Sequence, residues 1–165
     1  MNPMTYEPSY LENSWILSNK AQSLGTTAFV DIESQNGAAA RYMAAVTDGS
    51  VKIYCVNPWY GEQSFQKFLS NVTAEGSAEK IVPIRMTSDE AGAALNAVAE
   101  FIYIDSDKPD LGDRILGWAM HLTDNGVMGG NNWERPSVEL AVVSAAVELN
   151  LSISIEQNYW FLTRH

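Results

Sequence analysis

The stretch Thr27-Ala28-Phe29-Val30-Asp31-Ile32-Glu33-Ser34-Gln35-Asn36-Gly37 decides the fold class of this 165-residue chain. Its first six residues are rich in β-branched and aromatic side chains, and polar residues and a glycine follow them. A short apolar run of this kind is typical of a strand buried inside a parallel sheet. A helix-like segment, 38–46, comes directly after the glycine. The stretch therefore predicts a strand, a tight loop and a helix, which together open an α/β domain.

The same alternation continues along the chain. Further strand-like runs are 51–56, 81–86, 101–104 and 126–129, and further helix-like segments are 10–24, 63–72, 111–122, 137–149 and one that starts at Ser88-Asp89-Glu90. Short connections between such elements imply right-handed crossovers and helices on both faces of a parallel sheet. The runs 151–156 and 159–163 flank Gln157-Asn158 and predict an antiparallel β-hairpin.

We therefore expect a Rossmann-like, doubly wound, mostly parallel seven-stranded sheet that ends in this hairpin. We expect a single domain, in which a covering helix lies within 1–25 and the Rossmann-like core spans 26–165.

Charge and cysteine content limit the partners. Ten basic residues against twenty acidic ones give a formal net charge of −10. Nucleic-acid binding needs Lys and Arg to neutralise phosphates, and an anionic membrane surface has the same requirement. We therefore expect neither partner, and a small neutral or cationic molecule suits the charge. The single cysteine, Cys55, allows no disulfide within the chain and favours a cytoplasmic setting. A neighbouring subunit of a homo-oligomer could complete the binding crevice.

In an open α/β sheet, ligands bind beyond the carboxyl ends of the strands. The loops selected by this rule are 33–37, 57–62, 87–90, 105–110 and 131–135. Asp105, Asn131 and Asn132 could offer three oxygens to Mg²⁺ or a similar cation, which would lower the pKa of a substrate hydroxyl. Lys108 could then remove the proton of that hydroxyl. The alternative is that Asp105 caps a turn and Lys108 is a solvated surface residue.

Several stretches carry a family resemblance, and they are Tyr54-Cys55-Val56-Asn57-Pro58-Trp59, 65–72, 81–88 and 101–105. From about Phe29 to its end the chain resembles the class I S-adenosylmethionine-dependent methyltransferases, in particular small bacterial O-methyltransferases. The loop Asp105-Ser106-Asp107-Lys108 is similar to that of cation-dependent catechol and caffeoyl-type O-methyltransferases. In those enzymes the equivalents of Asp105 and an Asp-Asn pair bind the metal, and the lysine is the base.

The resemblance implies a set of cofactor contacts. Residues 31–37, with Asp31, Glu33, Ser34 and Gly37, would pass under the methionine part of S-adenosylmethionine. Asn57 would bind the ribose hydroxyls, and Thr87 and Ser88 would border the adenine. Trp59, whose indole could stack on a base or belong to the edge of the core, and Asp105 complete the cofactor candidates. The acceptor would enter over Asp105, Lys108 and Asn131.

Three positions depart from the family pattern. Glu33 stands where the family has a glycine, so its carboxylate would either block the cofactor or pair with its sulfonium or amino group. Asn57 replaces an acidic residue and can accept hydrogen bonds through one oxygen alone. Asn131 replaces the first metal carboxylate. Two hypotheses follow: methyl transfer to an oxygen of a small molecule, or a non-catalytic binding or interaction protein that has lost ligand groups.

Overall fold

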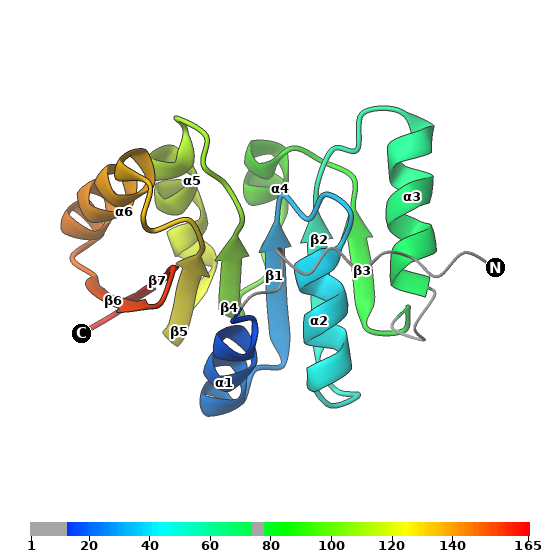
Figure 1. The fold of residues 1–165 in the computed structure, drawn as a ribbon, viewed down its shortest axis with the longest axis horizontal. Coiled ribbons are helices and arrows are strands. Elements are labelled where there is room, and N and C mark those ends of the chain that lie inside the picture. Colours follow the sequence, from blue (N-terminus) through cyan, green and yellow to red (C-terminus); the bar gives the residue numbers. More distant parts are fainter. Residues whose placement is uncertain (1–12, 74–77) are drawn as a thin grey trace.

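A seven-stranded sheet lies at the centre of the structure, a computed structural model that describes residues 13–73 and 78–165. The strands run in the order β3-β2-β1-β4-β5-β7-β6 (Figure 1). Their bounds are β1 Ala28–Ile32, β2 Lys52–Val56, β3 Ile81–Ile84, β4 Ala99–Ile104, β5 Leu122–Gly130, β6 Ser152–Glu156 and β7 Tyr159–Thr163. β1 to β5 are parallel, and β7 is antiparallel to both β5 and β6. The predicted mostly parallel sheet with its terminal hairpin is confirmed.

Helices cover both faces of this sheet, as predicted. Their bounds are α1 Trp15–Leu24, α2 Ala38–Val46, α3 Glu62–Thr73, α4 Ser88–Ala94, α5 Leu111–Trp118 and α6 Pro136–Leu149. Residues 10–12 of the expected first helix lie outside the described residues. None of the helices within the described ranges combines the length and the apolar character needed to cross a membrane.

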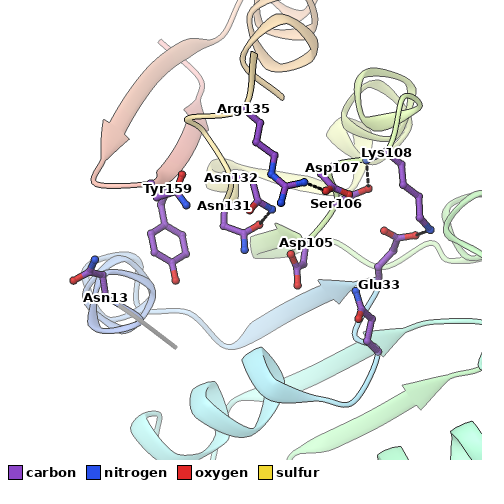
Figure 2. A pocket seen from close by; sticks show the side chains of 12 residues that line it. Asn13, Glu33, Asp105, Ser106, Asp107, Lys108, Asn131, Asn132, Arg135 and Tyr159 are labelled. Atoms are coloured by element: carbon purple, nitrogen blue, oxygen red, sulfur yellow. Dashed lines mark hydrogen bonds and ion pairs between the residues drawn. The ribbon is translucent and has the colours of Figure 1, made fainter. Parts of the chain in front are cut away.

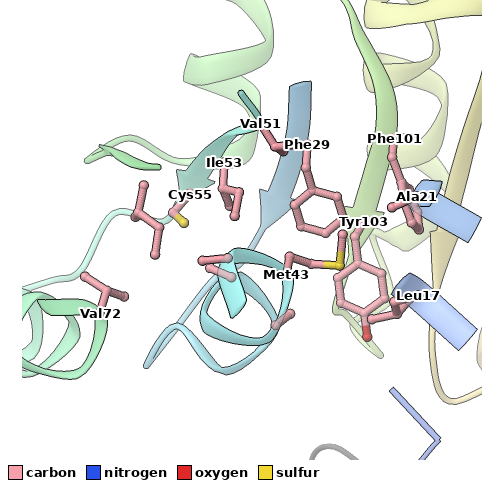
Figure 3. Packing of buried hydrophobic residues seen from close by; sticks show 14 of the residues in the cluster. Leu17, Ala21, Phe29, Met43, Val51, Ile53, Cys55, Val72, Phe101 and Tyr103 are labelled. Carbon is pink, nitrogen blue, oxygen red and sulfur yellow. The ribbon is translucent and has the colours of Figure 1, made fainter. Parts of the chain in front are cut away.

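Alternation along each strand divides the core into two clusters. Phe29 and Tyr103 belong to the cluster beneath α1, α2 and α3, and Figure 3 shows part of it. Val30 and Ile102, one residue along the same strands, pack with α4, α5 and α6. Successive side chains of a strand point to opposite faces, so both faces of a central strand must be apolar. This explains why the predicted strands are nearly continuous apolar runs.

The predicted helix 111–122 is wrong at its end. α5 stops at Trp118, a 3₁₀ turn spans Ala119–His121, and Leu122 opens β5. Leu122 lies opposite Ala99 of β4, and the register shifts between Ala99 and Phe101. The apolar spacing of Leu122 agrees with a helix, but pairing with β4 decides its conformation.

The order of the strands locates the binding crevice. From β1 the chain crosses to β2 and β3 on one side, and it then returns to place β4 and β5 on the other side of β1. The crevice of such a sheet opens where this direction reverses, between the carboxyl ends of β1 and β4.

Candidate functional site

A pocket of about 360 Å³ opens at the carboxyl ends of β1, β4 and β5 (Figure 2). The loops after these strands line it together with the β6–β7 turn and the residue before the α1 cap. The lining residues are Asn13, Glu33, Gln35, Asp105, Ser106, Asp107, Lys108, Asn131, Asn132, Arg135, Asn158 and Tyr159. Three of the five loops selected from the sequence thus meet here, whereas 57–62 and 87–90 contribute no lining residue to this pocket.

Glu33 joins the loop after β1 to α5. Its Oε1 lies 2.6 Å from Lys108 Nζ and 2.6 Å from an Arg114 guanidinium nitrogen, and the side chains of Glu33 and Arg114 are 15% and 12% exposed. Burial acts to raise the pKa of Glu33, but the hydrogen bonds and charges of Lys108 and Arg114 outweigh it and lower that pKa. Glu33 also has a left-handed backbone with φ 62°, a conformation that favours the glycine of the family pattern. Its carboxylate therefore pairs with cations of its own chain.

Arg114 was not among the residues selected from the sequence. It lies inside α5, and it also pairs with Asp110 one helical turn earlier at 2.8 Å. The i, i+4 spacing of Asp110 and Arg114 in the sequence is enough to predict this ion pair. The contact with Glu33 depends on the packing of α5 beside β1.

Asp31 is a buried acid at the end of β1. Its side chain is 1% exposed, and neither carboxylate oxygen has a hydrogen-bond partner among the described residues. Burial raises the pKa of Asp31 to about 7, although the nearby Ser34 hydroxyl and Ala40 amide act to lower it. The Ser34 hydroxyl donates instead to the backbone oxygen of Asp31 at 2.7 Å. Buried carboxyl groups are normally hydrogen-bonded, so the Asp31 carboxyl at the end of β1 is an exception among the described residues.

The three predicted metal-binding residues do come together in the pocket. Burial raises the pKa of Asp105 to about 6, the side chain of Asn131 lowers it, and Asp107 raises it. Asn132 Nδ2 donates to Asn131 Oδ1 at 2.9 Å. Burial and the charge of Asp105 raise the pKa of Tyr159 to about 12.

This donor set does not fit a divalent cation. Asp105 is the single carboxylate among the three predicted ligands, and the side-chain oxygen of Asn131 already accepts from Asn132. Within residues 13–73 and 78–165, no group of three or more His, Cys, Asp or Glu side chains could hold a metal ion. Mg²⁺ demands near-ideal octahedral geometry, and here one of the two amide oxygens already accepts a hydrogen bond from the neighbouring amide.

Lys108, the predicted base, contacts Glu33. Figure 2 shows its side chain extending to that carboxylate, while Asp107 pairs with Arg135 on the other side of the loop. The backbone N–H of Lys108 donates to Ser106 Oγ at 3.3 Å. The loop after β4 is therefore held by ion pairs on both sides, and the Lys108 ammonium is bound to Glu33.

Asn57 and Trp59 stabilise the loops beside the pocket. Asn57 Oδ1 accepts from the backbone N–H of Trp59 at 3.0 Å, and Trp59 Nε1 donates to the backbone oxygen of Gln35 at 2.7 Å. The indole is 4% exposed and packs on Phe65 and Phe68, with ring centroids 5.3 and 4.3 Å away. Trp59 thus lies in the core and supports the loop after β1.

Thr87, Ser88 and Gly37 also make structural contacts. Thr87 caps α4 in a reciprocal arrangement with Glu90, and the buried Ser88 hydroxyl accepts from Trp118 Nε1 at 2.9 Å. Gly37 has φ 82°, and a Cβ placed there would lie 2.9 Å from Val72 Cγ1. These three predicted cofactor residues do not line the pocket described above.

Comparison with known proteins identifies the fold. No protein-family model and no curated protein sequence matches the chain. The O-methyltransferase TomG from Streptomyces achromogenes, solved with SAM, has a TM-score of 0.74 at 11% identity, over 93% of this chain and 80% of that one. An O-methyltransferase from Bacillus cereus, solved with SAH, has a TM-score of 0.74 at 13% identity, over 93% and 81%.

A methyltransferase from Geobacter sulfurreducens has a TM-score of 0.76 at 13% identity, over 91% of this chain and 76% of that one. Similarity at these identities shows a shared fold. The chain therefore has the Rossmann-like fold of these methyltransferases.

Proposed function

We propose that the chain is an S-adenosylmethionine-dependent methyltransferase that acts on an oxygen of a small molecule. The observation that supports this most directly is the pocket at the carboxyl ends of β1, β4 and β5, the place where α/β sheets of this topology bind ligands. Two structures with the same fold were solved with SAM or SAH. When bound, the cofactor supplies an electrophilic methyl group on a sulfonium sulfur.

The loop after β1 would hold the methionine part of this cofactor. The buried Asp31 carboxyl has no partner among the described residues, and the cofactor's ammonium group would supply one. Glu33 and Ser34 would lie beside it. Asn57 would offer its amide nitrogen to the ribose, because its oxygen already binds Trp59. Thr87 and Ser88 would border the adenine.

In this proposal the residues of the chain promote the reaction mainly by positioning the acceptor. Asp105 and Asn131 would orient the acceptor hydroxyl, and a correctly held acceptor gains much of its acceleration from proximity. Asp105 lines the pocket beside Asn131, so its carboxyl group can accept the hydroxyl hydrogen bond. Once Lys108 has left Glu33 and lost a proton to solvent, its neutral amine could act as the base and take the proton of the acceptor hydroxyl. We assign no step to a metal.

Calorimetry with S-adenosylmethionine and S-adenosylhomocysteine tests this function. We expect binding to the full chain, and we expect Asp31→Asn to weaken it at least tenfold. Asp113→Asn, on the exposed face of α5, is the matched control and should leave binding unchanged. Absence of heat and of a thermal shift at millimolar ligand would reject the proposal in favour of a non-catalytic role.

We also propose that the protein forms a homo-oligomer through the outer face of α6. Leu140, Val143 and Val147 are 69%, 38% and 77% exposed and follow one another at helical spacing. A helix that is apolar on its outer face as well usually packs against another surface. Val147→Lys should then lower the mass seen by light scattering.

The buried thiol of Cys55 suits a cytoplasmic location, and the charge of −10 argues against nucleic-acid or membrane partners.

A further inference from the structure

We infer that the pocket binds a neutral, polyhydroxylated small molecule, such as a cyclic polyol or a sugar, as the methyl acceptor. This inference rests on the proposed function and adds the chemical class of the acceptor. It is based on three properties of the lining: its amide side chains, the pairing of its charges, and the near absence of aromatic surface.

Amide side chains make up five of the twelve lining residues: Asn13, Gln35, Asn131, Asn132 and Asn158. An amide carries both a donor and an acceptor, as does a hydroxyl group, so neighbouring amides match neighbouring hydroxyls. Two of these side chains, those of Asn13 and Gln35, make no hydrogen bond to another residue in the described part of the chain. They lie at the edge of the pocket toward α1 and the loop after β1, and they can bind a ligand without breaking a hydrogen bond to a described residue.

The charges of the lining disfavour an anionic acceptor. Lys108 is paired with Glu33, and Arg135 is paired with Asp107. The described part of the lining holds the three carboxylates of Glu33, Asp105 and Asp107 against these two cations. A phosphate or carboxylate group would have to break an ion pair and then face Asp105. A neutral molecule meets no such barrier, and its hydroxyls can donate to Asp105.

Among the described residues, the lining also offers no platform for a flat aromatic acceptor. Tyr159 is the one aromatic residue among the twelve, and its side chain is 5% exposed. Trp59 is in the core, and Trp133 packs on the cluster beneath α4, α5 and α6. Pockets for apolar ligands are lined mainly by hydrophobic side chains, and this one is not.

Binding measurements on the full chain, with and without S-adenosylhomocysteine, test this inference. The probes are myo-inositol, methyl glucoside, catechol and inositol monophosphate, and ligand-observed NMR gives their affinities. We expect each of the two neutral polyols to bind at least tenfold more tightly than catechol or the phosphate. Gln35→Leu and Asn131→Leu should each weaken polyol binding at least fivefold. Gln66→Leu, which removes an exposed amide from α3, is the matched control.

The results test the acceptor class and the methyltransferase function independently of each other. Failure of both polyols to bind in either state, or tighter binding of catechol or the phosphate, overturns the inference, and cofactor binding can still uphold the proposed function. Polyol binding without any cofactor binding supports the site and rejects the methyltransferase. If one pocket variant loses its far-ultraviolet circular dichroism, the other variant carries the comparison.

Discussion

Replacing Asp31 by asparagine should stabilise the folded protein at alkaline pH while it weakens cofactor binding. The carboxyl group is 1% exposed, and burial raises its pKa from 3.8 to about 7. A raised carboxyl pKa means that the folded state binds the proton more tightly than the unfolded chain does. Stability is therefore lost as the pH rises from the unfolded pKa of 3.8 through the folded pKa of about 7.

The size of this effect follows from the two pKa values. At pH 8 the Asp31 carboxyl is ionised in both the folded and the unfolded state. The difference of about three between its two pKa values then lowers the folding stability by about 4 kcal/mol. At pH 5 the folded carboxyl is still protonated, so the cost is about 1.5 kcal/mol. Asparagine is neutral at both pH values, and its unpartnered amide costs roughly 1–3 kcal/mol at each. The stability difference between Asp31→Asn and the natural chain should therefore shift by about 2.5 kcal/mol in favour of the variant between pH 5 and pH 8.

Urea denaturation followed by circular dichroism at pH 5, 6.5 and 8 measures this shift. The exposed-site variant Asp113→Asn is the matched control. A difference for Asp31→Asn that stays constant over this range would refute the reasoning that burial, with no partner, raises the pKa of Asp31. Calorimetry on the same samples should show weaker S-adenosylhomocysteine binding, because the ammonium group would lose its carboxylate partner.

Three further changes test the loops around the site. Glu33→Gln should lower the free energy of unfolding at pH 7 by about 2 kcal/mol, between the values for exposed and buried ion pairs, and leave Arg114 without this partner. Because the pKa of Glu33 is lowered, that loss should shrink in urea titrations as the pH falls from 4.5 through the lower pKa of the folded state. Glu33→Gly should cost about 1 kcal/mol less than Glu33→Gln because the left-handed backbone is relieved. Gly37→Ala should cost about 2 kcal/mol in the same assay, since its φ is 82° and its Cβ would press on Val72; an unchanged midpoint would contradict this packing. Thr87→Ala should lower stability by about 1 kcal/mol through loss of the α4 cap, and Thr87→Ser should restore most of it.

The elements of the fold could be predicted from short stretches because each strand is buried on both faces. Val30 and Ile32 face one cluster, and Phe29 faces the other, so all three positions had to be apolar. The alternation of apolar runs with polar segments also located the terminal hairpin and the loops at the carboxyl ends of the strands. It failed at Leu122, where an apolar residue fits both a helix face and a strand and the pairing with Ala99 decides.

The individual partners of the site residues could not be predicted in this way. Glu33 was identified as a departure, but its ion pairs with Lys108 and Arg114 require β1, the loop after β4 and α5 to be placed together. Likewise, Asn13 and Tyr159 line the pocket because α1 and the hairpin converge on it.

The amino-acid sequence alone was enough for the order of strands and helices, the sheet with its hairpin, and the end of the sheet at which polar side chains gather. These features depend on periodic burial, which a single segment records. Only the tertiary structure decided that Glu33 turns to α5, that Asp31 is left without a partner among the described residues, and that Trp59 belongs to the core. Each of these depends on contacts between segments far apart in the chain, and a local pattern of residue types does not specify such contacts.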